Sequence, residues 1–280
     1  TQPMTATGDA ADDPAIWKNP NETGDGLILG THKRQGIFVY DLQGEEVQFL
    51  PQGRINNIDL RNQFTSNSAL VAASNRTTKT VDLFSLDYQQ RKLIPYAHRI
   101  QTKMDDPYGL CMYHDQKKNQ FFVLVNDKDG LYQQWQITQS KDDVNSKLVR
   151  SFRLQGQPEG CVADDPQQQL FVGEENHGIW KINANPKASP QKTLIDSVKN
   201  NPMLEADVEG MAIYSQGKSN GYLIVSSQGN NSYAVYERSS PHQYRGSFKI
   251  IANPKHGIDG SSETDGLDVS SDTNGVNGYL

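Results

Sequence analysis

Residues Glu209-Gly210-Met211-Ala212-Ile213-Tyr214 form the motif that decides the fold, because versions of this motif recur along the whole chain. Each version is an acidic or polar residue followed by a short apolar run. The versions are centred on positions 13, 59, 108, 159, 209 and 265, so their spacings are 46, 49, 51, 50 and 56 residues. A period of about fifty residues predicts a repeat architecture. The other versions are Asp13-Pro14-Ala15-Ile16-Trp17, Asn57-Ile58-Asp59-Leu60, Tyr108-Gly109-Leu110-Cys111, Glu159-Gly160-Cys161-Val162 and Asp265-Gly266-Leu267.

Two further apolar runs follow most versions of the motif, and polar turns separate them. They are rich in Val, Ile, Phe and Tyr, which is typical of strands joined by hairpins. A fourth run is visible only at 148–154 and 244–251. Four short strands in each unit of about fifty residues predict the blade of a β-propeller. The second runs cover 26–30, 69–74, 121–125, 170–173 and 222–226, and the third cover 36–40, 80–86, 130–137, 178–182 and 232–236.

Six versions of the motif predict an all-β fold, a six-bladed β-propeller with four-stranded antiparallel blades, formed by residues 1–280 as a single domain. Only 15 residues follow Asp265, so we expect the sixth blade to be incomplete at its C-terminal end. Residues 1–12 have room for one strand that closes the ring, because an open sheet edge must be paired or covered. A two-sheet sandwich is the alternative, but a sandwich does not show this period six times.

Composition limits the functions that the chain can have. The 280 residues carry 27 Lys and Arg against 33 Asp and Glu, a net charge of −6, which argues against nucleic acid as a partner. The longest apolar run, 121–125, is too short for a membrane span. We expect a monomer that is secreted or periplasmic and has already lost its signal peptide. Cys111 and Cys161 form no metal motif and are expected to be buried as small hydrophobic residues.

Equivalent positions of propeller blades meet around one axis, so the repeat predicts which residues share a site. The first residues of the motifs supply an arc of acids, to which Asp207 is added because it lies two residues before Glu209. The turn after each second run supplies a second set. It is basic in the first three blades and acidic or amide-bearing in the next two. The predicted acidic arc contains Asp12, Asp13, Glu159, Glu175, Asp207, Glu209, Gln228 and Asp265, and the basic arc contains Lys33, Arg34, Arg76, Lys128 and the phenol of Tyr108.

Converging carboxylates repel one another, and a hard divalent cation relieves that repulsion. Oxygen ligands without paired His or Cys favour Ca²⁺ over Zn²⁺. Lys and Arg match an anion that has several oxygens, such as phosphate. Together the two arcs indicate metal-assisted phosphoryl transfer. Each residue taken singly also has a structural interpretation: an acid can form a turn, a Lys or Arg can be solvated, and Tyr108 can belong to the core.

Several longer motifs resemble those of the β-propeller phytases, the calcium-dependent alkaline phytases of bacteria. The resemblance extends from about Gly8 to Val269. The motifs that carry it are Asp12-Asp13-Pro14-Ala15-Ile16-Trp17, Asn56-Asn57-Ile58-Asp59-Leu60-Arg61, Ala73-Ser74-Asn75-Arg76, Glu159-Gly160, Asp207-Val208-Glu209-Gly210, Ser226-Ser227-Gln228-Gly229-Asn230 and Asp265-Gly266-Leu267-Asp268-Val269.

The resemblance implies a phosphomonoester hydrolase that releases phosphate from myo-inositol hexakisphosphate (phytate) and binds several Ca²⁺ ions. It implies that Asp13 with the carbonyl of Ile58 forms a stabilising calcium site, and that Asp259 and Gly260 form part of another. The residues implied to contact phosphate are Lys33, Arg34, Arg76, Tyr108 and Lys128. The implied ligands of the calcium cluster are Asp12, Glu159, Glu175, Asp207, Glu209, Gln228 and Asp265, of which Asp12, Glu159 and Glu209 are also expected to serve catalysis.

As a mechanistic hypothesis, a water or hydroxide held by calcium attacks phosphorus in line while Lys and Arg neutralise the phosphoryl oxygens. The chain lacks the RHGxRxP motif of the histidine acid phosphatases, and Gln167 stands where a cysteine-dependent phosphatase would have Arg after Cys161. Two alternatives remain open at this stage. One is a calcium-dependent lactonase or organophosphate hydrolase, whose pocket would be more apolar. The other is an inactive propeller that only binds phosphate.

Overall fold

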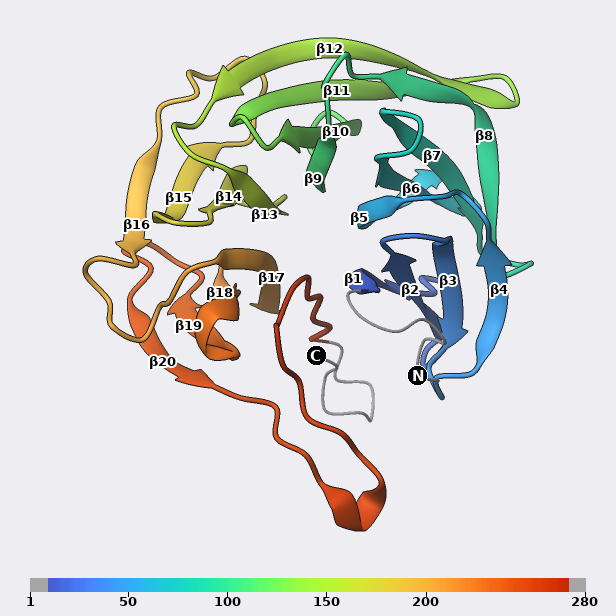
Figure 1. Ribbon diagram of the computed structural model, residues 1–280. Coiled ribbons are helices and arrows are strands. Elements are labelled where there is room, and N and C mark those ends of the chain that lie inside the picture. The colour runs from blue at the N-terminus through green and yellow to red at the C-terminus, as the bar shows by residue number, and fades with distance from the viewer. Residues whose placement is uncertain (1–9, 272–280) are drawn as a thin grey trace.

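The computed structural model describes residues 10–271, which form five four-stranded antiparallel sheets arranged as the blades of a propeller (Figure 1). Within this range the helices are two 3-10 turns, and no helix is long and apolar enough to cross a membrane. The elements are β1 (Ala11–Lys18), β2 (Gly26–His32), β3 (Gly36–Asp41), β4 (Glu46–Leu50), β5 (Ile55–Thr65), β6 (Ser68–Asn75), β7 (Thr80–Asp87), β8 (Lys92–Gln101), β9 (Pro107–Asp115), β10 (Gln120–Asp127), β11 (Leu131–Ser140), β12 (Asp143–Arg153), β13 (Pro158–Asp164), β14 (Gln169–Glu174), β15 (Gly178–Asn183), β16 (Thr193–Ser197), β17 (Val208–Gln216), β18 (Asn220–Ser227), η1 (Gln228–Asn230), β19 (Ser232–Glu237), β20 (Tyr244–Phe248) and η2 (Pro254–His256).

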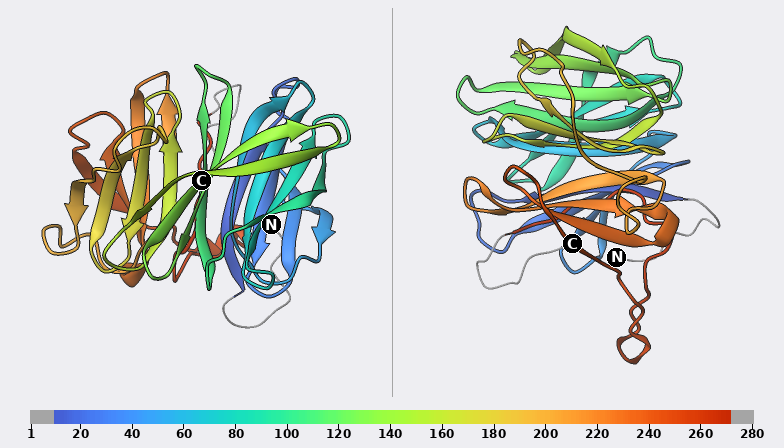
Figure 2. Two further views of the ribbon diagram at one scale, coloured as in Figure 1. Left: turned by 90° about the horizontal axis from the view of Figure 1, so that it is seen from above. Right: turned by 90° about the vertical axis from the view of Figure 1, so that its left-hand side faces the viewer.

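The first strand of every blade lies at the centre of the ring and the fourth lies outside. The inner strands β1, β5, β9, β13 and β17 contact one another in that order. The side views in Figure 2 show the blades as neighbouring sheets placed face to face around the axis. The N-terminal ends of the inner strands therefore gather at one mouth of a central channel.

The cores of the protein lie between adjacent blades. One cluster joins the first blade to the second, and there the fully buried Trp17 stacks on Tyr88 with a ring separation of 5.7 Å. Similar clusters join each following pair of blades. Because a blade is covered on both faces, its second strand reads as a continuous apolar run. All eight residues of β6 are buried, for example.

The predicted β-propeller with four-stranded antiparallel blades is confirmed, but the described residues form five such blades instead of the predicted six, of which the sixth was expected to be incomplete. The sixth motif nevertheless occupies the gap between β17 and β1 (Figure 1). The Gly210 amide donates to the Asp265 carbonyl at 3.3 Å, and the Gly266 amide donates to the Asp12 carbonyl at 3.1 Å. Leu267 packs in a cluster with Ala212 of β17. The segment 264–270 thus joins the ring without adding a four-stranded sheet. Residues 1–9, included in the expected closing strand, lie outside the described range.

A glycine follows the first residue in four of the six motifs, and it allows the inner strand there to approach the next one closely. A Cβ atom on Gly160 would lie 2.0 Å from the carbonyl oxygen of Glu209, and one on Gly210 would lie 2.7 Å from that of Asp265. Distances this short cannot be tolerated between a Cβ and backbone. The same contact recurs from Gly109 to Glu159, while Gly266 abuts Asp13. Glycine at these four positions is therefore a packing requirement of the ring.

Our expectation that the two cysteines are merely small hydrophobic residues is wrong. Both are buried, but Cys111 of β9 and Cys161 of β13 form a disulfide. The two residues are 50 positions apart, which is one repeat, so they face each other from adjacent inner strands. The bond links the third blade to the fourth beside the channel.

Candidate active site

The inner strand of every blade carries a register shift at the same place, directly after its first residue. In β13, Pro158 pairs with Glu174 and Cys161 pairs with Val172, so β13 has one extra residue. Equivalent shifts occur in β1, β5, β9 and β17. A bulge redirects the side chains within it. The ring positions, defined as the residue next to each shift and its counterpart in the sixth motif, are Asp12, Asn56, Tyr108, Glu159, Glu209 and Asp265.

This register corrects one assignment of the repeat. The sequence alignment of the motifs placed Asp59 with the other acids, but the ring position of the second blade is Asn56. Asp59 lies three residues further along β5, deeper in the channel. A bulge leaves no signal in the apolar pattern, so the sequence alone favours the acid Asp59 over the amide Asn56 at this place.

A backbone hydrogen bond places the turn that follows each second strand beside the ring. In four blades the amide of the turn residue donates to the carbonyl of the residue two positions before the ring position. The side chains of the turns and of the ring therefore share one mouth. The bonds are Lys33 to Ala10 at 2.9 Å, Arg76 to Arg54 at 2.8 Å, Glu175 to Gln157 at 2.9 Å and Gln228 to Asp207 at 2.9 Å.

Five carboxylates converge at this mouth, and we call them the mouth cluster: Asp12, Glu159, Glu175, Glu209 and Asp265. Carboxylate oxygens of Asp12, Glu159 and Asp265 lie within 4.8 Å of one another. The same holds for Glu159, Glu175 and Glu209, so Glu159 belongs to both groups. Four of the five residues are buried.

The mouth cluster holds more negative charge than its surroundings neutralise. Both oxygens of Asp12 and Oε2 of Glu209 are buried and receive no hydrogen bond from the described residues. Burial, followed by repulsion from Asp265, raises the pKa of Asp12. Burial, followed by repulsion from Glu159, raises the pKa of Glu209. Burial raises the pKa of Glu175 to about 7. A hard cation with oxygen ligands would neutralise these groups, so the residues fit Ca²⁺.

The basic residues line the same mouth. Lys33 Nζ lies 2.7 Å from Asp265 Oδ2 and 3.4 Å from Asp12 Oδ1, so this lysine borders the mouth cluster. Lys128 Nζ lies 4.0 Å from the centre of the Tyr108 ring.

The ring of Tyr108 contacts two cations. Arg76 Cζ lies 5.3 Å from the centre of its ring, and Lys128 lies closer. Burial and the negative charge of Glu159 raise the pKa of the phenol, so Tyr108 stays neutral and can donate a hydrogen bond. Arg34 shares the turn of Lys33, but it is exposed.

Some predicted site residues lie beside the cluster or away from it. Asp207 and Gln228 stand next to each other through their backbone bond, and Asp207 is close enough to raise the pKa of Glu175. Asp259 and Gly260 are exposed on the hairpin that projects from the ring (Figure 1), where the Gly260 amide donates to Asp259 Oδ1. The structure does not bring this pair to the other predicted ligands.

A second set of acids lies deeper, and we call Asp13, Asp59, Asp165 and Asp268 the channel acids. Each accepts a hydrogen bond from the backbone amide of an adjacent blade. The donors are Ile58 to Asp13 at 3.0 Å, Met112 to Asp59 at 2.7 Å, His114 to Asp165 at 3.1 Å and Ile16 to Asp268 at 2.7 Å. Asp13 thus lies beside Ile58, but the contact is with the amide of Ile58 and not with the carbonyl that the resemblance implies as a calcium ligand.

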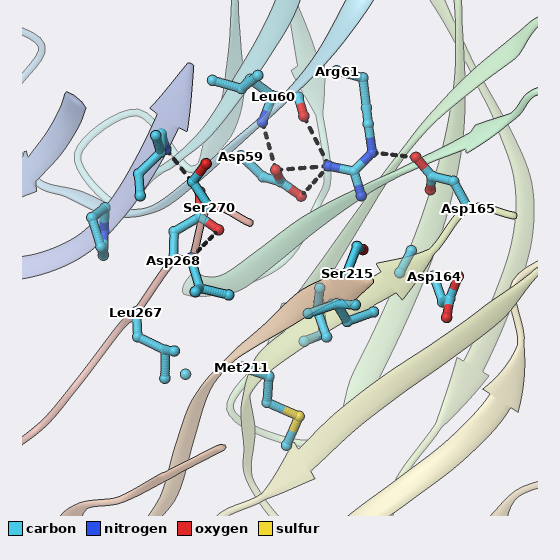
Figure 3. A pocket seen from close by; sticks show the side chains of 18 of the residues that line it. Asp59, Leu60, Arg61, Asp164, Asp165, Met211, Ser215, Leu267, Asp268 and Ser270 are labelled. Carbon is cyan, nitrogen blue, oxygen red and sulfur yellow. Dashed lines mark hydrogen bonds and ion pairs between the residues drawn. The ribbon is translucent and has the colours of Figure 1, made fainter. Parts of the chain in front are cut away.

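The channel acids line a cavity of about 430 Å³. Arg61 extends across it between Asp59 and Asp165 (Figure 3). Its Nη1 lies 2.9 Å from Asp59 Oδ1, and its Nε lies 2.7 Å from Asp165 Oδ2. Burial lowers the pKa of Arg61, but these ion pairs outweigh burial and raise that pKa. The fold itself thus supplies a donor to each channel acid, although burial still raises the pKa of Asp13, Asp165 and Asp268.

Two residues of the mouth were missed from the sequence. Asn56 is buried; its Nδ2 donates to Glu159 Oε1 at 2.8 Å, and its Oδ1 accepts from Arg76 Nη1 at 3.2 Å. Asp106 forms a bidentate ion pair with Arg76. A signal for Asp106 was present, because it lies two residues before Tyr108 as Asp207 lies two before Glu209. The pattern predicts a site acid two residues before another acid, and Tyr108 is not an acid.

The mouth can therefore hold cations on one side and an anion with several oxygens on the other. Carboxylate oxygens without donors call for metal ions. Lys33, Arg76 and Lys128 supply positive charge beside them. This pairing of functions is what the hydrolysis of a phosphomonoester requires.

Comparison with known proteins agrees with this chemistry. The sequence model of the phytase family matches residues 1–277. The chain is also similar to a 3-phytase of Bacillus subtilis (strain 168). The two are 40% identical over 278 residues, which cover 96% of this chain and 72% of that protein. The chain therefore belongs to the phytase family.

Proposed function

We propose that this phytase releases phosphate from phytate in a calcium-dependent reaction at the channel mouth. The observation that carries the proposal is the position of Glu159, which belongs to both groups of the mouth cluster and is linked through Asn56 to Arg76. Bound calcium would supply charge neutralisation and an activated water there. The residues that would hold it are Asp12, Glu159, Glu175, Glu209 and Asp265, with Asp207 and Gln228 beside them.

The basic residues bind and orient the phosphate that is to be cleaved. Phosphoryl transfer spreads negative charge over three equatorial oxygens, so catalysis depends on positioned cations. Lys33, Arg76 and Lys128 meet this requirement from three adjacent blades. The ring of Tyr108 lies beside Arg76 and Lys128, and its neutral phenol is a hydrogen-bond donor. Arg34, which is exposed, is suited to a second phosphate of the same substrate.

Phosphate release from phytate tests the proposal, measured with and without a calcium chelator. Chelation should abolish the release and added Ca²⁺ should restore it, whereas a rate unaffected by the chelator would exclude the calcium sites. Arg76→Ala and Lys128→Ala should each lower kcat/KM about a hundredfold or more, since each removes a charge that stabilises the transition state. Near wild-type rates in both variants would remove the basic residues from the site. A lactone substrate serves as the control and should not be hydrolysed.

We further propose that the ring has six positions and that 264–270 is the inner strand of the sixth. Two facts support this proposal: Asp265 continues the series of ring positions, and Gly266 packs on Asp13 as Gly160 packs on Glu209. A crystal structure of the calcium-loaded protein should show this segment paired between β17 and β1. A position for it outside the ring would refute the sixth position.

The disulfide supports a location outside the cytoplasm, because such bonds persist in oxidising compartments. We propose that the protein is secreted or periplasmic and acts as a monomer on a small-molecule substrate. Thiol titration of protein isolated from its native host should find Cys111 and Cys161 oxidised. Light scattering after gel filtration should give the mass of one chain. Free thiols or a larger mass would reject the corresponding statement.

A further inference from the structure

Arg76 is held at the mouth by three side-chain hydrogen bonds. Its Nε donates to Asp106 Oδ1 at 2.8 Å and its Nη2 donates to Asp106 Oδ2 at 2.6 Å. Its Nη1 donates to Asn56 Oδ1 at 3.2 Å. A guanidinium has five N–H groups, so one remains on each terminal nitrogen. These two are the donors available to an incoming phosphate.

The backbone fixes Asp106 in place for this contact. Asp106 follows the exposed Asp105 in the loop between β8 and β9, and it directly precedes the buried Pro107. A residue before proline is confined to extended conformations, which limits the directions that its side chain can take. Asp106 is also the residue two positions before the ring position Tyr108. In other blades the residue at this place is backbone-bonded to the turn that carries a site residue.

Without Asp106, the guanidinium of Arg76 would be attracted mainly to other carboxylates of the mouth. Glu159 accepts a hydrogen bond from the same Asn56 that Arg76 contacts, and Asp12 is close enough to act on the guanidinium electrostatically. A guanidinium that is released from Asp106 would turn toward these carboxylates or into solvent. In either position it would leave the place beside Tyr108, where it faces the phosphate side of the mouth.

We propose that Asp106 is a positioning residue that holds Arg76 in the orientation needed for phosphoryl transfer. The inference rests on the proposed role of Arg76 in binding the phosphate that is cleaved. Asp106 contributes no contact to the substrate, and its negative charge by itself disfavours a polyanion. Its benefit to catalysis is therefore confined to the geometry of Arg76. A positioning role and a purely electrostatic role consequently predict different changes in kcat and KM.

Asp106→Asn tests the proposal through steady-state kinetics on phytate at saturating Ca²⁺. A positioning role predicts that kcat falls about tenfold to a hundredfold, the size of effect that follows from a small misplacement of a catalytic group. KM should change much less. A purely electrostatic role predicts the opposite, a lower KM with kcat unchanged or raised. Asp106→Glu keeps the charge with altered reach and should give a kcat between those of Asp106→Asn and the wild type.

A double-mutant cycle with Arg76→Ala shows whether the effect acts through the arginine. The double variant should be as slow as Arg76→Ala alone, to within about twofold, because the two residues act as one unit. Independent, multiplying losses would overturn the inference. Asp105→Asn is the matched control, since its side chain is fully exposed and should leave kcat within about twofold of the wild type. Equal behaviour of Asp106→Asn and Asp105→Asn would also overturn the inference.

Melting curves with Ca²⁺ should show that each of these variants is folded at the assay temperature. If Asp106→Asn is unfolded there, the Asp106→Glu variant carries the cycle, and additive losses in that cycle reject the positioning role. A near wild-type rate for Arg76→Ala is a different result: it removes the proposed phosphate site, and the role of Asp106 with it. Loss in Arg76→Ala with no loss at Asp106 rejects the positioning role alone.

Discussion

The mouth cluster and the channel acids line the same channel, but their charges are balanced in different ways. Every channel acid accepts a hydrogen bond from a backbone amide of an adjacent blade, and Arg61 forms ion pairs with two of these acids. In the mouth cluster, oxygens of Asp12 and Glu209 receive no such donor within the described range. An acid at a strand end can therefore accept hydrogen bonds from the backbone of the ring, or it can keep oxygens without donors that are able to bind a cation. The presence or absence of backbone donors distinguishes the two cases.

The largest effect expected from breaking this comparison is on activity at the mouth. Glu159→Gln removes the carboxylate that the two carboxylate groups of the mouth cluster share, while it keeps an acceptor for Asn56. We expect kcat/KM for phytate to fall by about 10²–10³-fold, as for the loss of one strong electrostatic contact in a transition state. Phosphate release at saturating Ca²⁺ measures this. A loss below about tenfold would show that Glu159 is not central to the cluster.

The disulfide joins the inner strands β9 and β13 and should affect stability more than chemistry. It closes a loop of 50 residues, so replacing Cys111 and Cys161 together by Ala should lower the free energy of unfolding by roughly 4 kcal/mol. Denaturant unfolding of the calcium-loaded protein measures the change. At low temperature the variant should retain its kcat. A large loss of kcat in a fully folded variant would mean that the bond positions Glu159.

The matching change among the channel acids is Asp165→Ala. It removes one of the two carboxylate partners of Arg61 and leaves the His114 amide without an acceptor. We expect the free energy of unfolding to fall by about 1–3 kcal/mol, since the amide loses its hydrogen bond while Arg61 keeps its ion pair with Asp59. Phytate hydrolysis below the melting temperature should be unchanged. If activity fell as it should in Glu159→Gln, the division between the two sets would not hold.

The smallest expected effect is a pH dependence of the metal-free protein. Burial raises the pKa of Glu175 from 4.5 to about 7, so the folded state keeps a proton that the unfolded state loses over this range. The contribution of Glu175 to stability is therefore greatest below pH 4.5 and declines as the pH rises to about 7. Melting temperatures in chelator should fall over this range less steeply in Glu175→Gln than in the wild type. Calcium should reverse the trend, because it competes with protons. Parallel curves for the two proteins would assign the pH dependence to other groups.

Much of the fold could be predicted because the buried strands and the glycines carry strong signals. The motif around Gly160 and Gly210 marks each inner strand, and the second strands are apolar throughout. The outer strands β4, β8 and β16 were not predicted. They lie on the outside of the ring, where mostly exposed side chains give no apolar pattern. The disulfide was missed because it joins different blades.

The site was predicted less completely, for a physical reason. Charge at repeated positions predicts its acids, and the structure places Asp12, Glu159 and Asp265 close together. Asn56 was passed over in favour of Asp59 because the bulge in β5 is a property of the hydrogen-bond register. Asp106 was passed over because its role depends on its contact with Arg76. Positions could be derived from the repeat, but contacts between blades could not.

The glycine that follows a ring position has a consequence for how this site can change. Because Gly160 and Gly210 pack on the backbone of the next inner strand, their spacing does not depend on the side chain that precedes them. The ring positions that a glycine follows accordingly carry Tyr, Glu or Asp at different points of the ring. Exchanging those side chains alters which ions and anions the mouth accepts while the frame keeps its dimensions. The side chains at these ring positions can thus be exchanged one at a time, which changes the specificity of the site without moving the backbone.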